Sequence, residues 1–393
     1  MMEPKITITS EENNTLYFTL SNTPTSLANS LRRIILSEIP TVVFRTFPHS
    51  ESKVNIITNT SRFNNEILKQ RIGCIPIHIN DTEFPIDEYS IELDIKNDSD
   101  ATILVTTKDF KIKNITSDKY ISESAVRNIF PPDPITGDFI PLCRLRPKLS
   151  DNLDGEHLQF ISTLDYGHSK EDGMYNVVST CAYGATIDTV TANDKWIDIQ
   201  KDYEKKGLSK EEIDFEKENW FLLDGKRITI PNSYDFVIES VGVFTNFAIV
   251  YKACDIMIKK CRYMMSLLEK MDNSPDTEIN QEIKNKDENM NHVSKIKIET
   301  NENSTISNEF LITLKDQDYT IGNALVYFLY EDHFIKDKSL SFVGFKVPHP
   351  HIPNGVIRMG FNTTETNTTV IQYLNSACQK VIEIFSKIQK NFK

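Results

Sequence analysis

The sequence predicts an α+β protein in which a single chain folds as an intrachain pseudo-dimer, with a mainly β domain inserted into its first half. Three observations lead to this prediction. A strand-and-helix unit near the N-terminus recurs late in the chain, a long amphipathic helix closes each half, and the first half is much longer between these shared ends. Duplicated units of this kind are expected to pair about a pseudo-twofold axis, so that each covers the apolar helix face of the other.

The opening unit contains the stretch SLANSLRRIILSEIP from Ser26, which returns as TIGNALVYFLYEDHF from Thr320. An alternating apolar segment precedes each copy, TLYFTL in the first and NEFLITL in the second, and period-two spacing predicts a strand. In the first copy Pro24 suits the first helical turn and Pro40 ends the helix. Coincidence between two amphipathic helices is the competing explanation. At one constant offset the copies align Thr19 with Thr313, Leu20 with Leu314, Leu27 with Ile321, Asn29 with Asn323, and Leu31 with Leu325.

The closing unit is a strand followed by a long helix. YDFVIESVGVF precedes YKACDIMIKKCRYMMSLLEKM in the first half, and GVIRMGF precedes LNSACQKVIEIFSKIQKNF in the second. Both helices share Ala-Cys, at Ala253 and Ala377, and apolar residues at helical spacing. Agreement at both ends, in the same order, favours duplication. We call the contact surface between the halves the seam, and the residues expected in it are Leu27, Asn29, Leu31, Ile34, Ile35, Met257, Ile321, Asn323, Leu325, Val381 and Phe385.

The unequal halves predict four regions. The first dimerisation domain is discontinuous, over 1–45 and 226–270, because the inserted domain occupies 46–225. Residues 271–292 are polar and lack aromatic side chains, which predicts a flexible linker. The second dimerisation domain covers 293–393.

The composition excludes several classes of protein. The chain of 393 residues has a net charge of −12, which argues against general binding to polyanions. The N-terminus MMEPKITITS has no apolar signal segment, and charges interrupt the longest apolar run, so neither secretion nor a membrane span is expected. The six cysteines form no Cys-x-x-Cys pair, which argues against structural zinc and fits a reducing compartment.

Several stretches resemble a known family. LSNTPTSLANSLRRIILSEIPTVVF, followed by NTSRFNNEILKQRIGCIPIHI, resembles the alpha-like components of cellular RNA polymerases, which comprise the third-largest subunit of eukaryotic polymerase II, its archaeal D-type counterpart and the bacterial alpha N-terminal domain. DPITGDFIPLCRLRP is similar to that family's inserted domain. DQDYTIGNALVYFLYEDHF and VGFKVPHP resemble the small eleventh subunit and its archaeal L-type counterpart. A single chain with both parts is similar to the fused subunit of large cytoplasmic DNA viruses, and the Asn-, Ile- and Lys-rich composition fits an AT-rich genome.

The resemblance implies a protein that does no chemistry itself. It implies an assembly platform of a DNA-directed RNA polymerase, which pairs its own halves and holds the largest and second-largest catalytic subunits, chiefly the second-largest. Small polymerase subunits are further expected partners, and DNA is reached only through the complex. The expected location is the virion and the host cytoplasm for a viral protein, and otherwise the nucleus or cytoplasm. No cofactor is expected.

Five residues are expected to bind a partner subunit: Arg32, Arg33, Arg71, Gly73 and Pro76. Arg32 and Arg33 are adjacent, so on a helix they diverge by about 100° and cannot share one partner. One is expected to point toward the seam and the other outward. Two solvated surface arginines are the simpler alternative, but the resemblance favours an Arg fork on a carboxylate or carbonyl cluster of a large subunit.

Two other functions stay open at this point. His349 and His351 in PHPH could be part of the metal site of a stand-alone hydrolase, but a metal needs three or four ligands and only two are evident, so no metal is expected. A nucleic-acid-binding transcription factor is the other alternative, against which the acidic balance argues. The sequence shows no Gly-rich phosphate loop and no nucleophile elbow.

Overall fold

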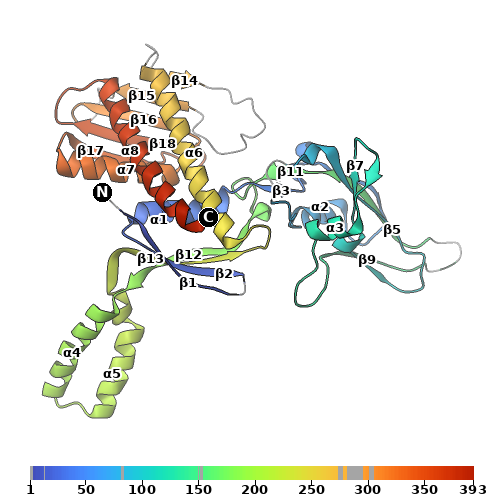
Figure 1. The fold of residues 1–393 in the computed structure, drawn as a ribbon, viewed down its shortest axis with the longest axis horizontal. Helices are drawn as coiled ribbons and strands as arrows, with labels where there is room; N and C mark the ends of the chain where they lie inside the picture. Colours follow the sequence, from blue (N-terminus) through green and yellow to red (C-terminus); the bar gives the residue numbers. More distant parts are fainter. Residues whose placement is uncertain are drawn as a thin grey trace.

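The structure is a computed structural model that describes residues 3–12, 14–80, 84–148, 150, 154–272, 278–280, 295–300 and 305–393. Two helix-and-sheet units lie against each other through their helices, and a β-rich domain and a helical hairpin extend from the first of them (Figure 1). The predicted linker at 271–292 lies largely outside the described residues. The mixed helix-and-strand fold, with two dimerisation domains and a β-rich region between their ends, confirms the predicted fold class.

The first half is a four-stranded antiparallel sheet with two helices. Its strand order is β1-β2-β13-β12, so strands that are far apart in the sequence are neighbours. The strands alternate buried and exposed positions because one face packs on the helices. The elements are β1 (Lys5–Glu12), β2 (Thr15–Ser21), α1 (Thr25–Ser37), β12 (Val178–Ile187), β13 (Thr229–Ser240) and α6 (Asn246–Asp272).

The second half repeats this arrangement without an insertion. Its sheet has the order β14-β15-β16-β18-β17, and the order β15-β16-β18-β17 corresponds strand for strand to the first sheet. Strand β2 spans 15–21 and β16 spans 309–315, a separation of 294 positions at both ends. The helices α1 and α7 begin at 25 and 319, again 294 positions apart. The elements are β14 (Glu278–Asn280), β15 (Lys295–Thr300), β16 (Glu309–Lys315), α7 (Tyr319–Leu329), a π-helix η7 (Tyr330–Lys336), β17 (Leu340–Lys346), β18 (Asn354–Phe361), α8 (Asn367–Gln389) and the 3₁₀ turn η8 (Lys390–Phe392).

The residues between α1 and β12 form a separate domain with its own apolar core. The domain contains a five-stranded sheet of order β4-β10-β5-β7-β8. The short antiparallel pair of β3 and β11 connects the domain to the first half. Its strands are β3 (Thr41–Val43), β4 (Val54–Asn59), β5 (Tyr89–Lys96), β6 (Ile103–Thr106), β7 (Lys111–Asn114), β8 (Lys119–Tyr120), β9 (Pro141–Leu145), β10 (His157–Thr163) and β11 (Asp165–Gly167). Its helices are α2 (Asn65–Gly73) and α3 (Glu123–Ile129), with the 3₁₀ turns η1 (His49–Glu51), η2 (Ile86–Glu88), η3 (Thr107–Asp109) and η4 (Gly173–Tyr175).

The predicted inserted range of 46–225 contains two separate excursions. Strand β12 pairs along its length with β13, so it belongs to the first sheet. After β12 a hairpin of two helices, α4 (Thr189–Lys205) and α5 (Lys210–Leu222), extends away from that sheet, and the turn η5 (Asp224–Arg227) returns the chain to β13 (Figure 1). A Ser209 and Glu212 capping box begins α5, and aromatic contacts of Trp196 with Trp220 and Phe221 hold the two helices together.

Candidate seam and partner-binding surface

The two halves share one hydrophobic core. Helix α1 packs on α7 and α6 packs on α8, so all four contribute buried side chains to a single cluster. The C-terminal end of α8 lies beside the N-terminal end of α6, where the Phe392 ring is 5.2 Å from Phe18 and 5.7 Å from Phe247, measured between centroids. A core that neither half can complete alone makes the pairing part of folding.

The structure brings the expected seam residues together on these helices. Nine of them are at most 1% exposed, and Asn29 and Asn323 are half-buried at the edge. The nine buried residues are Leu27, Leu31, Ile34, Ile35, Met257, Ile321, Leu325, Val381 and Phe385. Gly322 allows a close approach within the second half, because an added Cβ would lie 2.3 Å from the Phe345 ring.

Polar contacts join the beginning of α7 to α1. The hydroxyl of Ser30 donates to the carbonyl of Thr320 at 2.5 Å. Arg33 donates through Nε to the hydroxyl oxygen of Thr320 and through Nη2 to Asp318, both at 2.8 Å. The resulting ion pair is about one-third exposed on both sides. Arg33 is therefore the arginine of the pair that points toward the seam, as expected for one of the two, and its binding to another subunit stays a prediction.

Of the other expected partner-binding residues, Arg71 and Gly73 make contacts inside the inserted domain. Arg71 donates to the carbonyls of Leu142 and Pro141, both at 2.7 Å, and so ties α2 to β9. Gly73 is buried, and an added Cβ would lie 2.7 Å from both Met174 and Thr46. These contacts give Arg71 and Gly73 structural roles inside the inserted domain. Arg32 and Pro76 are half-buried, and the side chain of Arg32 donates to the amide oxygen of Asn29, one turn away, at 3.0 and 3.1 Å.

A buried ion pair connects the C-terminal end of α1 to α6. Lys260 of α6 pairs with Glu38, which follows the last residue of α1, and the two side chains are 1% and 3% exposed. In a buried ion pair each charge is stabilised by its partner instead of by water. Removing one partner therefore leaves the other charge buried and uncompensated. This pair fixes the end of α1 against the long helix of the same half.

No metal centre emerges from the described residues. His349 and His351 have ring centroids 5.1 Å apart, and the backbone N–H of His351 donates to Nδ1 of His349 at 3.1 Å. Within the ranges given above, no group of three or more His, Cys, Asp or Glu side chains could hold an ion. In those same ranges no helix combines the length and hydropathy needed to cross a membrane.

Comparison with known protein families assigns both halves. The model of the RNA polymerase Rpb3/Rpb11 dimerisation domain matches residues 17–261, and a second model with the same description matches 309–391. The chain belongs to the Rpb3/Rpb11 dimerisation family. The first match contains the inserted domain and the helical hairpin, and the second begins and ends within the repeated unit.

Rpb3/Rpb11-type relatives are RNA polymerase subunits. The chain is 26% identical to the DNA-directed RNA polymerases I and III subunit rpac1 of Dictyostelium discoideum over 309 residues, which are 68% of this chain and 83% of that protein. It is 24% identical to the RNA polymerase subunit Rpo3 of Pyrococcus furiosus over 282 residues, with 68% of this chain and 98% of Rpo3 covered. A shorter match, 40% identity over 83 residues, links it to polymerase II subunit RPB3 of Schizosaccharomyces pombe, over 21% of this chain and 26% of RPB3.

Three seam residues, Asp318, Thr320 and Phe392, are not among those predicted from the sequence. Asp318 and Thr320 form the acceptor site for Arg33, and Asp318 also accepts the N–H of Thr320 at 2.8 Å as the N-cap of α7. An Asp two residues before a Thr at a helix start was a usable capping signal. Phe392 carried no comparable signal, because its contact with Phe18 depends on the fold.

The Asp318 carboxylate should make the seam sensitive to acid. Burial acts to raise its pKa, but hydrogen bonds from Thr320 and the charge of Arg33 outweigh burial and lower the pKa to about 2. Because the folded pKa is depressed, its contribution to stability is present above the unfolded pKa near 3.8 and is lost as the pH falls toward 2. At pH 7 we expect Asp318→Asn to lower the free energy of unfolding by about 1–2 kcal/mol, allowing for partial exposure.

Urea titrations at pH 7 and at pH 2.5 measure this effect. The difference between Asp318→Asn and the parent chain should shrink at the lower pH. Asp316→Asn, two residues earlier, is the matched control for a carboxylate outside the Arg33 pair. An undiminished difference at pH 2.5 would show that the Asp318 charge does not stabilise the seam.

Proposed function

We propose that this protein is a non-catalytic assembly subunit of a multisubunit DNA-directed RNA polymerase. The observation that carries the proposal is the pairing of two Rpb3/Rpb11 dimerisation domains in one chain around one core. The paired helices form a platform, and the inserted domain and the hairpin extend from it at different places (Figure 1). A platform of this shape suits the task of holding large subunits in register.

The second-largest subunit is the proposed principal partner, with the largest subunit and small subunits as further partners. Arg32 is the proposed contact, because Arg33 is engaged in the seam while Arg32 donates its hydrogen bonds to Asn29 on its own helix. A guanidinium fork of this kind is suited to a carboxylate or a carbonyl cluster on another chain. Pro76, half-buried after α2, is a second proposed contact point.

A viral origin is the finer part of the proposal. The fusion of both dimerisation domains in one chain and the Asn-, Ile- and Lys-rich composition support a large cytoplasmic DNA virus, with the protein in the virion and the host cytoplasm. The hydrolase and transcription-factor alternatives gain no support from the family matches or from the His349 loop.

Co-purification with the large subunits tests the proposal. The tagged full chain is co-expressed with candidate largest and second-largest subunits, and mass spectrometry identifies the chains that it retains. Arg32→Ala should weaken capture at least about tenfold, as expected for truncation of a charge at a desolvated interface. Its thermal unfolding should stay close to that of the parent, because the hydrogen bonds that the substitution removes run to Asn29 within the same helix.

Arg227→Ala is the matched control, since Arg227 is exposed and pairs with Asp224 just three residues away. Arg33→Ala distinguishes seam stability from partner capture, because it should lower the stability of the seam. Failure of the parent chain to retain any polymerase subunit would overturn the proposed function. Normal capture by Arg32→Ala would remove only the role given to Arg32.

A further inference from the structure

One side of α5, the second helix of the hairpin, presents large apolar side chains to solvent. Phe215 is 63% exposed and Leu222 is 62% exposed. They are seven positions apart, which is about two helical turns, so both point to the same side of the helix. Trp220, which packs against Trp196 of α4, lies about 140–160° away around the helix. The exposed pair is therefore separate from the contacts that hold the hairpin together.

Three carboxylates accompany the apolar pair on that side of α5. Glu211 and Glu218 each lie four positions before one of the apolar residues, so the four side chains form one stripe along the helix. Asp214 lies beside this stripe, between the two glutamates in the sequence. All three carboxylates are exposed, and the described part of the chain offers them no hydrogen-bond or ion-pair partner. We call the surface formed by these five residues the α5 stripe: Glu211, Asp214, Phe215, Glu218 and Leu222.

The cations of α5 lie on another side of the helix. Lys210 and Lys217 each precede a glutamate of the α5 stripe by one position, so their side chains diverge from it by about 100°. The stripe thus has three negative charges and no positive charge. Asp214 and Glu218 are four positions apart, and like charges at this spacing repel each other. A cation from another chain would relieve this repulsion.

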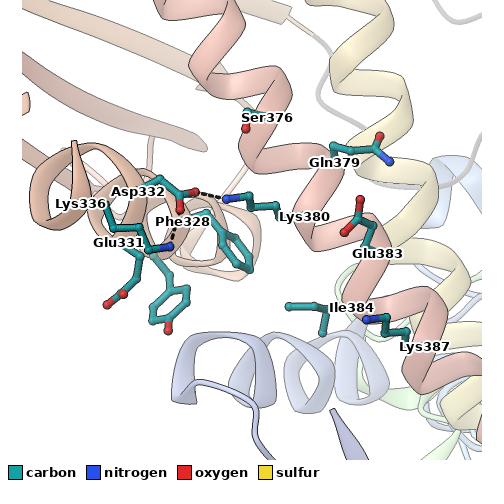
Figure 2. A pocket seen from close by; sticks show the side chains of 11 residues that line it. Phe328, Glu331, Asp332, Lys336, Ser376, Gln379, Lys380, Glu383, Ile384 and Lys387 are labelled. Carbon is teal, nitrogen blue, oxygen red and sulfur yellow. Dashed lines mark hydrogen bonds and ion pairs between the residues drawn. The ribbon is translucent and has the colours of Figure 1, made fainter. Parts of the chain in front are cut away.

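Two other surfaces of the chain contain balanced charges. On α4, Lys201 pairs with Asp198 at 3.0 Å, and Lys205 pairs with Asp202 at 3.3 Å. The open pocket between η7 and α8 has three acidic and three basic side chains (Figure 2): Glu331, Asp332, Glu383, Lys336, Lys380 and Lys387. The α5 stripe differs from both surfaces, because all of its charges have the same sign.

The position and the charge of the α5 stripe restrict what can cover it. The hairpin extends away from the first sheet, apart from the inserted domain and the second half (Figure 1). A second copy docked through the same stripe would bring carboxylates against carboxylates, and a nucleic acid would bring phosphates, so both would be repelled. A protein segment with a Lys or Arg beside a large apolar side chain complements the stripe in charge and in polarity.

We propose that the α5 stripe is a docking site for a segment of a partner polymerase subunit, in which a Lys or Arg lies beside a large apolar side chain. The apolar side chain of that segment covers Phe215 and Leu222, and its cation lies against the carboxylates of Glu211, Asp214 and Glu218. The inference rests on the proposed function, since it names a further contact surface of the same assembly subunit.

Truncation of the apolar pair tests the site in the assembled complex. The tagged full-length variant Phe215→Ala/Leu222→Ala is co-expressed with candidate largest, second-largest and small subunits, and mass spectrometry quantifies the retained chains. We expect retention of one subunit to fall about tenfold or more, because the variant loses the apolar contacts of the docked segment. Val190→Ala/Ile197→Ala is the matched control and should retain every subunit, because it removes two exposed apolar side chains at the same spacing on α4.

Charge variants test the electrostatic attraction itself. Glu211→Lys/Glu218→Lys should lower retention of the same subunit more than Glu211→Gln/Glu218→Gln does, because the lysines add repulsion where the glutamines only remove attraction. Thermal unfolding of each free variant should stay close to that of the parent, since these side chains are exposed. Parent-like retention of every subunit by the apolar variant and by both charge variants would overturn the proposal.

A photo-crosslinking amino acid at Leu223, which is 65% exposed and follows Leu222, identifies the occupant directly. The proposal predicts a crosslink to a polymerase subunit, at a segment with a Lys or Arg beside a large apolar residue. A crosslink to a second copy of this chain, to nucleic acid or to another segment of the same chain would contradict it, as would no crosslink in a complex that assembles. Failure of the parent chain to retain any polymerase subunit would instead count against the proposed function.

Discussion

Replacing Lys260 by methionine should lower the free energy of unfolding by about 3–5 kcal/mol, because Glu38 would remain as a buried charge without a partner. Both side chains are almost inaccessible to water, so solvent cannot compensate for the loss. Methionine has a similar length and fills most of the same space, and the effect therefore reports on charge more than on packing. Guanidinium denaturation of the full chain measures the change.

Two further variants make this result specific. The double change Lys260→Met/Glu38→Gln removes both charges and should recover most of the lost stability. Lys259→Met alters the adjacent residue, which is half exposed and pairs with Asp255 one turn away, and should cost less than about 0.5 kcal/mol. Equal losses from Lys259→Met and Lys260→Met would contradict the role of the buried pair.

Splitting the chain should leave two fragments that need each other. When residues 1–272 and 295–393 are co-expressed as separate chains, we expect them to co-purify in equal amounts and to support polymerase assembly. Their helices form one core, so the covalent connection between the halves contributes only effective concentration, on the order of mM. Expressed alone, residues 1–272 should aggregate, because α1 and α6 would expose their buried faces.

Size-exclusion chromatography with light scattering distinguishes the outcomes. A Leu325→Ala change in the second fragment should weaken the pairing, because it removes side-chain volume from a fully buried seam position, at a typical cost of about 2–5 kcal/mol. A surface change such as Lys315→Ala is its control. Two soluble, folded monomers with no mutual affinity would mean that the halves are independent domains.

The repeated units could be predicted from the sequence because their signals are local. The alternation in β2 and β16 and the apolar spacing in α1 and α7 are set by residues a few positions apart in the sequence. The corresponding elements of the two copies also begin at the same offset of 294 positions. The boundary of the inserted domain could not be predicted as well. Strand β12 belongs to the first sheet only through its pairing with β13, and the helical hairpin between them hides that connection.

The partners of individual side chains at the seam could not be predicted from the sequence. The sequence places Arg32 and Arg33 on different sides of one helix, and in the structure they have different partners, but the sequence cannot say which one meets the second half. That depends on Asp318, which lies 285 positions further along the chain.

The shared core also has a consequence for synthesis on the ribosome. Helix α6 ends at Asp272, and the helix that covers it, α8, occupies almost the last part of the chain. At about 5–20 residues per second, the roughly 120 residues that follow α6 take on the order of 6–24 seconds to translate. During that interval the first half is complete in sequence but has no partner for its apolar helices. The nascent chain therefore exposes the apolar faces of α1 and α6 for a period set by the number of residues between its two long helices.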